Sequence, residues 1–225
     1  MCDSSCAPLQ HRLPLLFLFV GGLAAGGAGL AAPAAGQIVP VGDDIAVSQR
    51  DGDHESGASV AADHQGGWGV TWQSEDLDFA HPAGRQRRFD RDGGPVSGTL
   101  RDHELVGADL GLDGEGNGVL AGVRPRPELG GAEVDALCVD LLGAPRGARV
   151  RVDAGAISGA TRRLSSVRVA TATDGTSVVV WQETPVDFVT PPSVFFRRLL
   201  ADGTPTGNVG SLGAVGVVGR LEPEV

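Results

Sequence analysis

The sequence predicts an all-β protein built from repeated antiparallel sheets. Short apolar runs rich in Val and aromatic residues alternate with turns of Gly, Asp and Pro, and 35 of the 225 residues are Gly. No segment beyond the N-terminal 36 residues has the periodicity of a helix. One long stretch of the chain also occurs a second time, which is typical of a repeat architecture.

The recurring stretch covers residues 173–208 and contains a strand, a connection, a second strand and a turn. Its first strand follows Asp174-Gly175, and its second ends before Pro205, which cannot donate to a strand ladder. About 109 residues earlier, the same order of rare residue types appears. The matched pairs are Trp72 and Trp181, Phe79 and Phe188, Phe89 and Leu199, Gly93 and Gly203, and Pro95 and Pro205.

A weaker third copy lies between these two. Residues 113–118 supply its first turn, residues 134–140 supply a strand, and Gly143-Ala144-Pro145 supplies its closing turn. Gly122 falls where the other copies have Trp. A repeat of this length is one supersecondary unit that buries its face against a neighbour.

The predicted units follow one another along the chain. Residues 37–57 are expected to form a leading strand and turn, and residues 214–225 a tail. Three four-stranded units lie between them, at about 58–105, 106–152 and 165–213. The second strand of a unit holds the Trp position, the third holds the paired Arg, and the fourth follows the turn that contains Gly and Pro.

Residues 1–36 have the pattern of a secretory signal helix. Arg12 precedes the apolar run 13–20, and small residues at 31–35 suit cleavage. An uncleaved anchor is the alternative, because residues 13–30 have the minimum length of a membrane span. The protein is therefore expected to be secreted, periplasmic or on the cell surface, without further membrane contact. Removing the signal leaves Cys138 as the one cysteine, so no internal disulfide is expected.

The units resemble a repeat of secreted bacterial proteins with a β-propeller-like fold, whose pattern is DGxxVVVWQ followed by QRFDxDGxPxG. The first half is matched by residues 174–182 and the second by residues 86–95. The resemblance implies four-stranded antiparallel blades and no catalytic or cofactor-binding residues. Propellers close with about 4–8 blades. Three blades would therefore form an open or incomplete propeller, or would close as a homo-oligomer.

The candidate site residues are of two kinds. Trp72 and Trp181 repeat and are expected in the core, whereas the unrepeated Trp68 could stack on a sugar. Acidic residues in Gly-rich turns could bind Ca²⁺, although Asp and Gly also form turns without metal. Arg124 stands where an EF-hand loop would need Glu, so that motif fails. The calcium candidates are Asp90, Asp92, Asp113, Glu115 and Asn117.

Three function hypotheses remain from the sequence. The leading one is a non-catalytic structural or interaction module that contacts a protein or polysaccharide surface. The formal charge of −10, with scattered Arg and no Lys, excludes the basic footprint of a nucleic-acid-binding protein. The first alternative is a carbohydrate-active hydrolase or lyase on a propeller scaffold. The second is a calcium-dependent carbohydrate-binding or adhesion module. No other cofactor is expected.

Overall fold

The computed structural model describes residues 44–48, 54–75, 83–96, 101–127, 130–153, 162–187 and 189–214. All of them belong to one of the two units into which the chain divides, residues 44–225. The predicted signal segment 1–36, Phe79, Phe188 and the end of the predicted tail lie outside the described residues. Within the described ranges, no helix has the length and apolar character needed to cross a bilayer.

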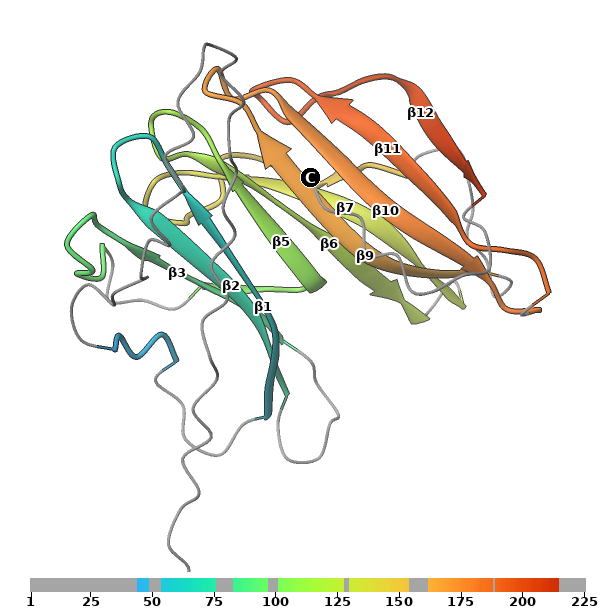
Figure 1. Ribbon diagram of the computed structural model, residues 1–225, viewed down its shortest axis with the longest axis horizontal. Coiled ribbons are helices and arrows are strands. Elements are labelled where there is room, and N and C mark those ends of the chain that lie inside the picture. Colours follow the sequence, from blue (N-terminus) through green and yellow to red (C-terminus); the bar gives the residue numbers. More distant parts are fainter. Residues whose placement is uncertain are drawn as a thin grey trace, which may run out of the picture. The chain divides into compact units, whose positions relative to one another are not determined.

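The described residues form three antiparallel four-stranded sheets, which confirms the predicted all-β class (Figure 1). In each sheet the strands are neighbours in the order in which they follow along the chain. Sheet 1 contains β1 (His54–Ala62), β2 (Trp68–Glu75), β3 (Ala83–Phe89) and β4 (Arg101–His103). Sheet 2 contains β5 (Val106–Leu112), β6 (Gly118–Arg126), β7 (Gly131–Val139) and β8 (Val150–Arg151). Sheet 3 contains β9 (Arg162–Thr171), β10 (Ser177–Pro185), β11 (Ser193–Leu199) and β12 (Pro205–Ala214).

Each sheet contains the same five-residue turn twice. The N–H of the first turn residue donates to the carbonyl of the fifth at 2.8–2.9 Å in all six turns. The fourth residue is always Gly, with φ between 78° and 90°, a conformation that side chains other than Gly adopt only with strain. These glycines are Gly66, Gly93, Gly116, Gly143, Gly175 and Gly203.

The position of Asp in these turns differs between the sheets. In sheets 1 and 2, Asp is the first residue, and one of its oxygens accepts the N–H groups of the third and fifth residues. In sheet 3, Asp174 and Asp202 are third residues and accept the N–H of the fifth. After the second turn of each sheet, Pro pairs with the residue that ends the third strand. These pairs are Phe89 with Pro95, Val139 with Pro145, and Leu199 with Pro205.

The sheets pack face against face, with β5 in contact with both β1 and β9. The apolar cluster between sheets 1 and 2 combines Leu105, Leu110, Leu120 and Leu137 with Ala61 of β1. At the turn end of this interface, the buried Arg88 of β3 donates to the Gly116 carbonyl. Burial lowers the pKa of the Arg88 guanidinium, while Asp63, Asp113 and Asp140 act in the opposite sense. The turns of sheets 1 and 2 are thus joined by a buried cation.

The cluster between sheets 2 and 3 is larger and contains Trp181. Trp181 is fully buried among Val119, Ala121, Val134 and Val179, with Phe195 stacked 6.0 Å from its ring. The other members that are buried include Ala136, Val152, Leu164, Val167, Val169 and Leu199.

The other two Trp residues lie in sheet 1. Trp72 is 5% exposed and occupies in β2 the register position of Trp181 in β10. Trp68 is half-buried and stacks on Phe89 with ring centroids 4.0 Å apart. Arg87 lies over the Phe89 ring at 5.4 Å. Trp68 is therefore engaged with an aromatic neighbour of its own sheet.

The predicted leading strand at 37–57 has a different structure wherever it is described. Residues 44–48 form no strand, and residues 54–57 already belong to β1. The carbonyls of Ala46 and Val47 instead accept hydrogen bonds from Arg87 Nη1 at 3.3 and 3.0 Å. A cation on β3 therefore holds this segment, in place of a strand ladder.

Asp109 on β5 connects the first strands of all three sheets. One carboxylate oxygen accepts the Ser59 hydroxyl of β1, and the other accepts the Val169 N–H of β9 at 2.8 Å. Asp109 is 7% exposed, and β5 has a register irregularity between Val106 and Asp109 where it leaves β6. Both donors would be left in a buried interface if this carboxylate were removed.

We expect Asp109→Ala to lower the free energy of unfolding by about 1–3 kcal/mol, because a buried N–H and a hydroxyl lose their acceptor. Urea unfolding followed by Trp fluorescence measures the change. Asp92→Ala is the matched control, since Asp92 lies in an exposed turn. An equal loss in the two variants would show that Asp109 does not hold the sheets together.

Candidate functional site

A cluster of eight charged side chains lies at the end of sheet 2 remote from its Gly-containing turns. Glu133 pairs with Arg124, and Asp135 pairs with Gly122, across β6 and β7. These positions share the face of Leu120 and Leu137, while Val134 and Ala136 face sheet 3. The members are Glu104, Arg124, Arg126, Glu133, Asp135, Arg149, Arg151 and Asp153.

The cluster occupies sheet 2 because this sheet lacks the Trp of the others. Gly122 has the register position that Trp72 and Trp181 occupy in their sheets. A Cβ at Gly122 would lie 2.9 Å from Leu105 Cβ, so no side chain fits there without a shift. Asp135, opposite Gly122, therefore has no bulky cross-strand neighbour, and its carboxyl group can approach the arginines.

Arg124 contacts three of the carboxyl groups, and its Nε lies 3.4 Å from Glu104 Oε2. Its Nη1 lies 3.5 Å from Asp135 Oδ2 and 3.8 Å from Glu133 Oε1. Glu133 also accepts from Arg126 Nη1 at 2.8 Å and lies 3.6 Å from Arg151 Nε. Among the described residues, Glu133 thus contacts three guanidinium groups, whereas Asp135 contacts only that of Arg124, at 3.5 Å.

Asp135 is the least satisfied member of the cluster. Its side chain is 3% exposed, and its Oδ1 is buried without a hydrogen-bond partner among the described residues. Burial raises the pKa of Asp135, and the neighbouring Glu133 raises it further; Arg124 acts in the opposite sense. Asp135 is thus a buried carboxyl group with a raised pKa, next to Glu133, which contacts three guanidinium groups.

The remaining members support this pair from both sides. Arg151 Nε donates to Asp153 Oδ1 at 2.7 Å, which raises the pKa of Arg151. Burial raises the pKa of Asp153 more than this contact lowers it. At the surface, Arg149 Nη1 binds Glu104 Oε2 at 2.7 Å and lowers the pKa of Glu104. The buried acids are thus separated from solvent by arginines.

Sheet 3 has a smaller ionic group at the equivalent end. Glu183 on β10 has the register position of Arg124 on β6 and is 3% exposed. It accepts from Arg162 Nη1 at 2.7 Å and from Trp181 Nε1 at 3.2 Å. Both oxygens of Glu183 therefore have a donor, unlike those of Asp135.

The calcium candidates lie in two separate turns. Asp90 and Asp113 each use Oδ1 to accept two N–H groups of their own turn. Asn117 donates to Asp113 Oδ2 at 3.3 Å, and Asp92 lies 4.0 Å from Arg91. Glu115 is exposed. Within the described ranges, no three His, Cys, Asp or Glu side chains gather as a metal site requires. Calcium binding stays a prediction.

The repeat residues that the structure describes occupy turn and core positions and include no member of the charged cluster. Sequence analysis did not identify Glu133 and Asp135, because acidic residues on a strand usually indicate a solvent-exposed face. A usable signal was present: Asp135 interrupts the apolar run 134–139, opposite the Gly122 that replaces Trp. A charged residue within an apolar run indicates that its side chain does not pack into an apolar core.

Of the comparisons with known proteins, only the one with solved structures found matches. No family model matches the chain, and no curated protein matches it. An arabinanase from Bacillus subtilis aligns at 14% identity and a TM-score of 0.44, over 72% of this chain and 60% of the arabinanase. An endo-arabinase from Bacteroides thetaiotaomicron aligns at 15% identity and a TM-score of 0.44, over 68% and 60%. An endo-1,4-β-xylanase from the same species aligns at 15% identity and a TM-score of 0.42, over 69% and 59%.

The chain therefore spans about three fifths of the length of these solved proteins. An arabinanase, an endo-arabinase and an endo-1,4-β-xylanase are enzymes by name, and this finding contradicts the expectation of a non-catalytic structural or interaction module. The proposal for the chemistry of this chain is therefore based on its own residues.

We expect Asp135→Asn to raise stability at neutral pH, because the buried side chain then no longer has to be ionised. Since the folded-state pKa of Asp135 is raised, its stabilising contribution is present below the unfolded pKa of about 3.9 and is lost as pH rises through the folded pKa. The gain from Asp135→Asn should accordingly grow from pH 4 to pH 8. Urea unfolding across this range measures it.

Asp174→Asn is the control of opposite sign. Hydrogen bonds from Thr176 lower the pKa of Asp174, so its contribution is present above the unfolded pKa and is lost as pH falls. This variant should be less stable than the parent at neutral pH and converge with it in acid. A pH-independent effect of Asp135→Asn would show that Asp135 is not a destabilised acid.

Proposed function

We propose that this chain is a carbohydrate-active hydrolase or lyase whose acid–base pair is Asp135 and Glu133. The observation that carries the proposal is the buried Asp135 carboxyl group, with a raised pKa and an oxygen that lacks a partner among the described residues. Buried acids of this kind are costly and are typical of sites that transfer protons near neutral pH. In hydrolysis, Asp135 donates a proton to the glycosidic oxygen as its bond to the anomeric carbon breaks. Glu133 either takes a proton from the water that attacks this carbon, or attacks it first and is then released by water.

The surrounding arginines give the two carboxyl groups different environments. Arg126 and Arg151 contact Glu133, while Arg124 contacts both acids through one nitrogen. The Arg124 and Arg151 side chains are 31% and 37% exposed. When the guanidinium groups of Arg124 and Arg151 turn outward, they bind substrate hydroxyl groups. The substrate then reaches Asp135 and Glu133.

The proposal includes a propeller-like arrangement of the sheets as blades. It is supported by the packing of β5 on both β1 and β9, which are the first strands of the three sheets. The order of the strands in each sheet, which follows the chain, also supports it. The match of residues 174–182 and 86–95 to the repeat pattern of secreted bacterial propeller-like proteins supports the same arrangement. Secretion is part of the proposal and rests on the signal pattern of residues 1–36.

Release of reducing ends or unsaturated products from arabinan, xylan and a panel of other polysaccharides tests the proposal with the full chain. Asp135→Asn should lower kcat by about 10²–10⁴-fold, the usual contribution of a general acid, with a smaller change in KM. Asp174→Asn, in an exposed turn, should leave turnover unchanged. No turnover on any polysaccharide, or full activity of Asp135→Asn, would overturn the assignment.

A further inference from the structure

Glu104 is the one acid of the charged cluster whose carboxylate lies at the surface. Its side chain is 68% exposed, whereas those of Glu133, Asp135 and Asp153 are 11%, 3% and 0% exposed. Glu104 belongs to the short link between β4 and β5, so it reaches the cluster from outside sheet 2. Of the four acids, it is therefore the one that can move away into water.

Two guanidinium groups hold this exposed carboxylate. Arg149 Nη1 binds Glu104 Oε2 at 2.7 Å, and Arg124 Nε lies 3.4 Å from the same oxygen. The Arg149 and Arg124 side chains are 21% and 31% exposed, so they are more enclosed than the carboxylate that they bind. Arg149 Nε is buried without a hydrogen-bond partner among the described residues. The two arginines thus form a site for a carboxylate at which Glu104 satisfies only part of the available donors.

The guanidinium group of Arg124 also contacts the proposed general acid. Its Nη1 lies 3.5 Å from Asp135 Oδ2, while its Nε lies near Glu104. Burial raises the pKa of Asp135, and the charges of Arg124 and Arg149 both act against this shift, which shows that Arg149 is close to the acid as well. A carboxylate in the place of Glu104 would therefore be separated from Asp135 by a single guanidinium group.

The charge of the cluster favours an anion at this place. The cluster contains four arginines and four acids, and Asp135 must hold its proton in order to act as the general acid. Four guanidinium groups then face three carboxylates. Exposed ion pairs such as that of Glu104 contribute little to stability, so its displacement costs little. Arginine is also suited to a carboxylate, because its planar donors match the two oxygens.

We propose that the substrate of this site is a polysaccharide of uronate sugars, and that a substrate carboxylate replaces Glu104 between Arg124 and Arg149. The inference rests on the proposed function, because it places the acidic sugar beside Asp135. Glu104 fills the carboxylate site in the absence of substrate and turns into water when the substrate binds. Glu104 is thus an internal competitor of the substrate, and Arg149 is a ligand of its carboxylate.

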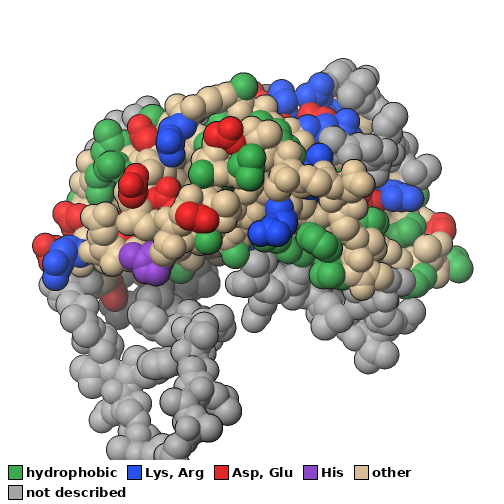
Figure 2. All heavy atoms as spheres, turned by 90° about the horizontal axis from the view of Figure 1, so that it is seen from above, with side chains coloured by type: hydrophobic (Ala, Val, Ile, Leu, Met, Phe, Trp, Pro, Cys, Tyr) green, Lys and Arg blue, Asp and Glu red, His purple; other side chains and the backbone are tan. Residues whose placement is uncertain are grey.

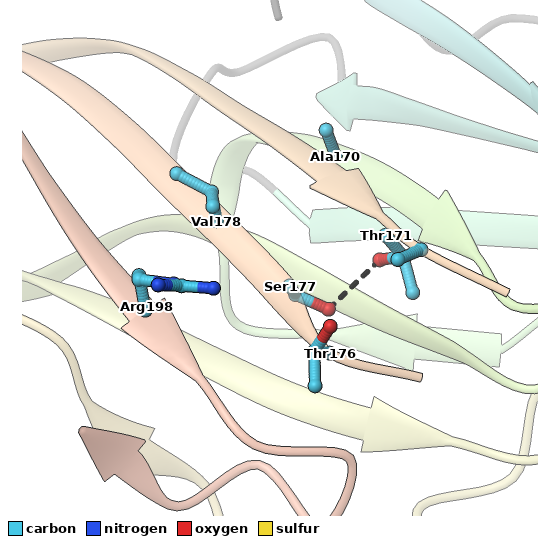
Figure 3. Close-up of a pocket in the computed structure, with 7 residues that line it drawn as sticks. Ala170, Thr171, Thr176, Ser177, Val178 and Arg198 are labelled. Atoms are coloured by element: carbon cyan, nitrogen blue, oxygen red, sulfur yellow. Dashed lines mark hydrogen bonds between the residues drawn. The ribbon is translucent and has the colours of Figure 1, made fainter. Parts of the chain in front are cut away.

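A hollow in sheet 3 provides a matched guanidinium group outside the cluster. Figure 3 shows Arg198 reaching from β11 towards β10 in this hollow, which has a volume of about 350 Å³. Arg198 is exposed and has no ion-pair partner among the described residues. None of the residues that line the hollow with it is acidic, so the hollow contains no carboxyl group for general acid catalysis. These residues are Ala170, Thr171, Ala172, Thr176, Ser177 and Val178.

Calorimetric titration of the full-length Asp135→Asn variant, in which turnover is removed, tests the proposal. The probes are oligosaccharides of galacturonate, glucuronate and mannuronate, each paired with its carboxyl-reduced form, which has the same linkages and no charge. At least one acidic oligosaccharide should bind roughly 10–100-fold more tightly than its reduced form, the usual contribution of hydrogen bonds to a charged group. Equal affinities within every pair would overturn the proposal.

Substitutions at the two ends of the ion pair should have opposite effects in the same background. Arg149→Gln should weaken binding of the preferred acidic oligosaccharide about tenfold, because its carboxylate loses a donor. Glu104→Gln should strengthen this binding, because the competing carboxylate is gone. Arg198→Gln and Asp92→Asn remove the same charges at exposed positions elsewhere and should leave the affinity unchanged. Equal effects in the variants and their controls would show that only overall charge matters and would overturn the site.

Turnover separates a failure of this inference from a failure of the proposed function. A parent chain that cleaves only neutral polysaccharides would overturn the substrate class and leave the acid–base pair in place. Selective binding that depends on Arg149 and Glu104, without turnover of any polysaccharide, would support the carboxylate site and overturn the proposed catalysis. Cleavage of an acidic polysaccharide, with a lower KM and an unchanged kcat in Glu104→Gln, would support both.

Discussion

The carboxylate of Asp109 is the interaction on which the arrangement of the sheets depends. It accepts from Ser59 and Val169, and it thereby holds β1, β5 and β9 at one point of contact. Apolar packing alone has no direction and would allow the sheets to slide over one another. A buried acceptor with two donors from different sheets removes this freedom, because each displacement leaves a polar group unsatisfied.

The repeated sheet is a scaffold in which single positions change their role. The position of Trp181 holds Trp72 in sheet 1 and Gly122 in sheet 2, where Leu105 packs closely over the Gly and Asp135 is its cross-strand partner. Figure 2 shows acidic, basic and hydrophobic side chains interspersed over the face in view. The departures from the repeat, rather than the repeat itself, distinguish the functional candidates.

Sequence reasoning succeeded where the cause is local. Gly143 and Pro145 act within a few residues, so the turn and the break after it could be predicted without knowing what lies opposite. It failed where burial depends on a neighbouring sheet. Arg88 and Arg198 stand in equivalent strands, yet one is buried against a turn of sheet 2 and the other is exposed. For the same reason Asp135 could not be recognised as a buried acid from its position on a strand.

Among the described residues, sheet 2 is the one sheet with a neighbour on both faces, and this explains why the least satisfied acid lies there. A carboxyl group at an exposed position of a sheet could turn to water, whereas Asp135 is enclosed between β6, β8 and the arginines. Replacing such a group by an apolar residue would stabilise the chain. Glu183 in sheet 3 shows that the fold can satisfy both oxygens of a buried acid, so Asp135 Oδ1, which lacks a partner among the described residues, distinguishes the acid on which the proposed proton transfer depends.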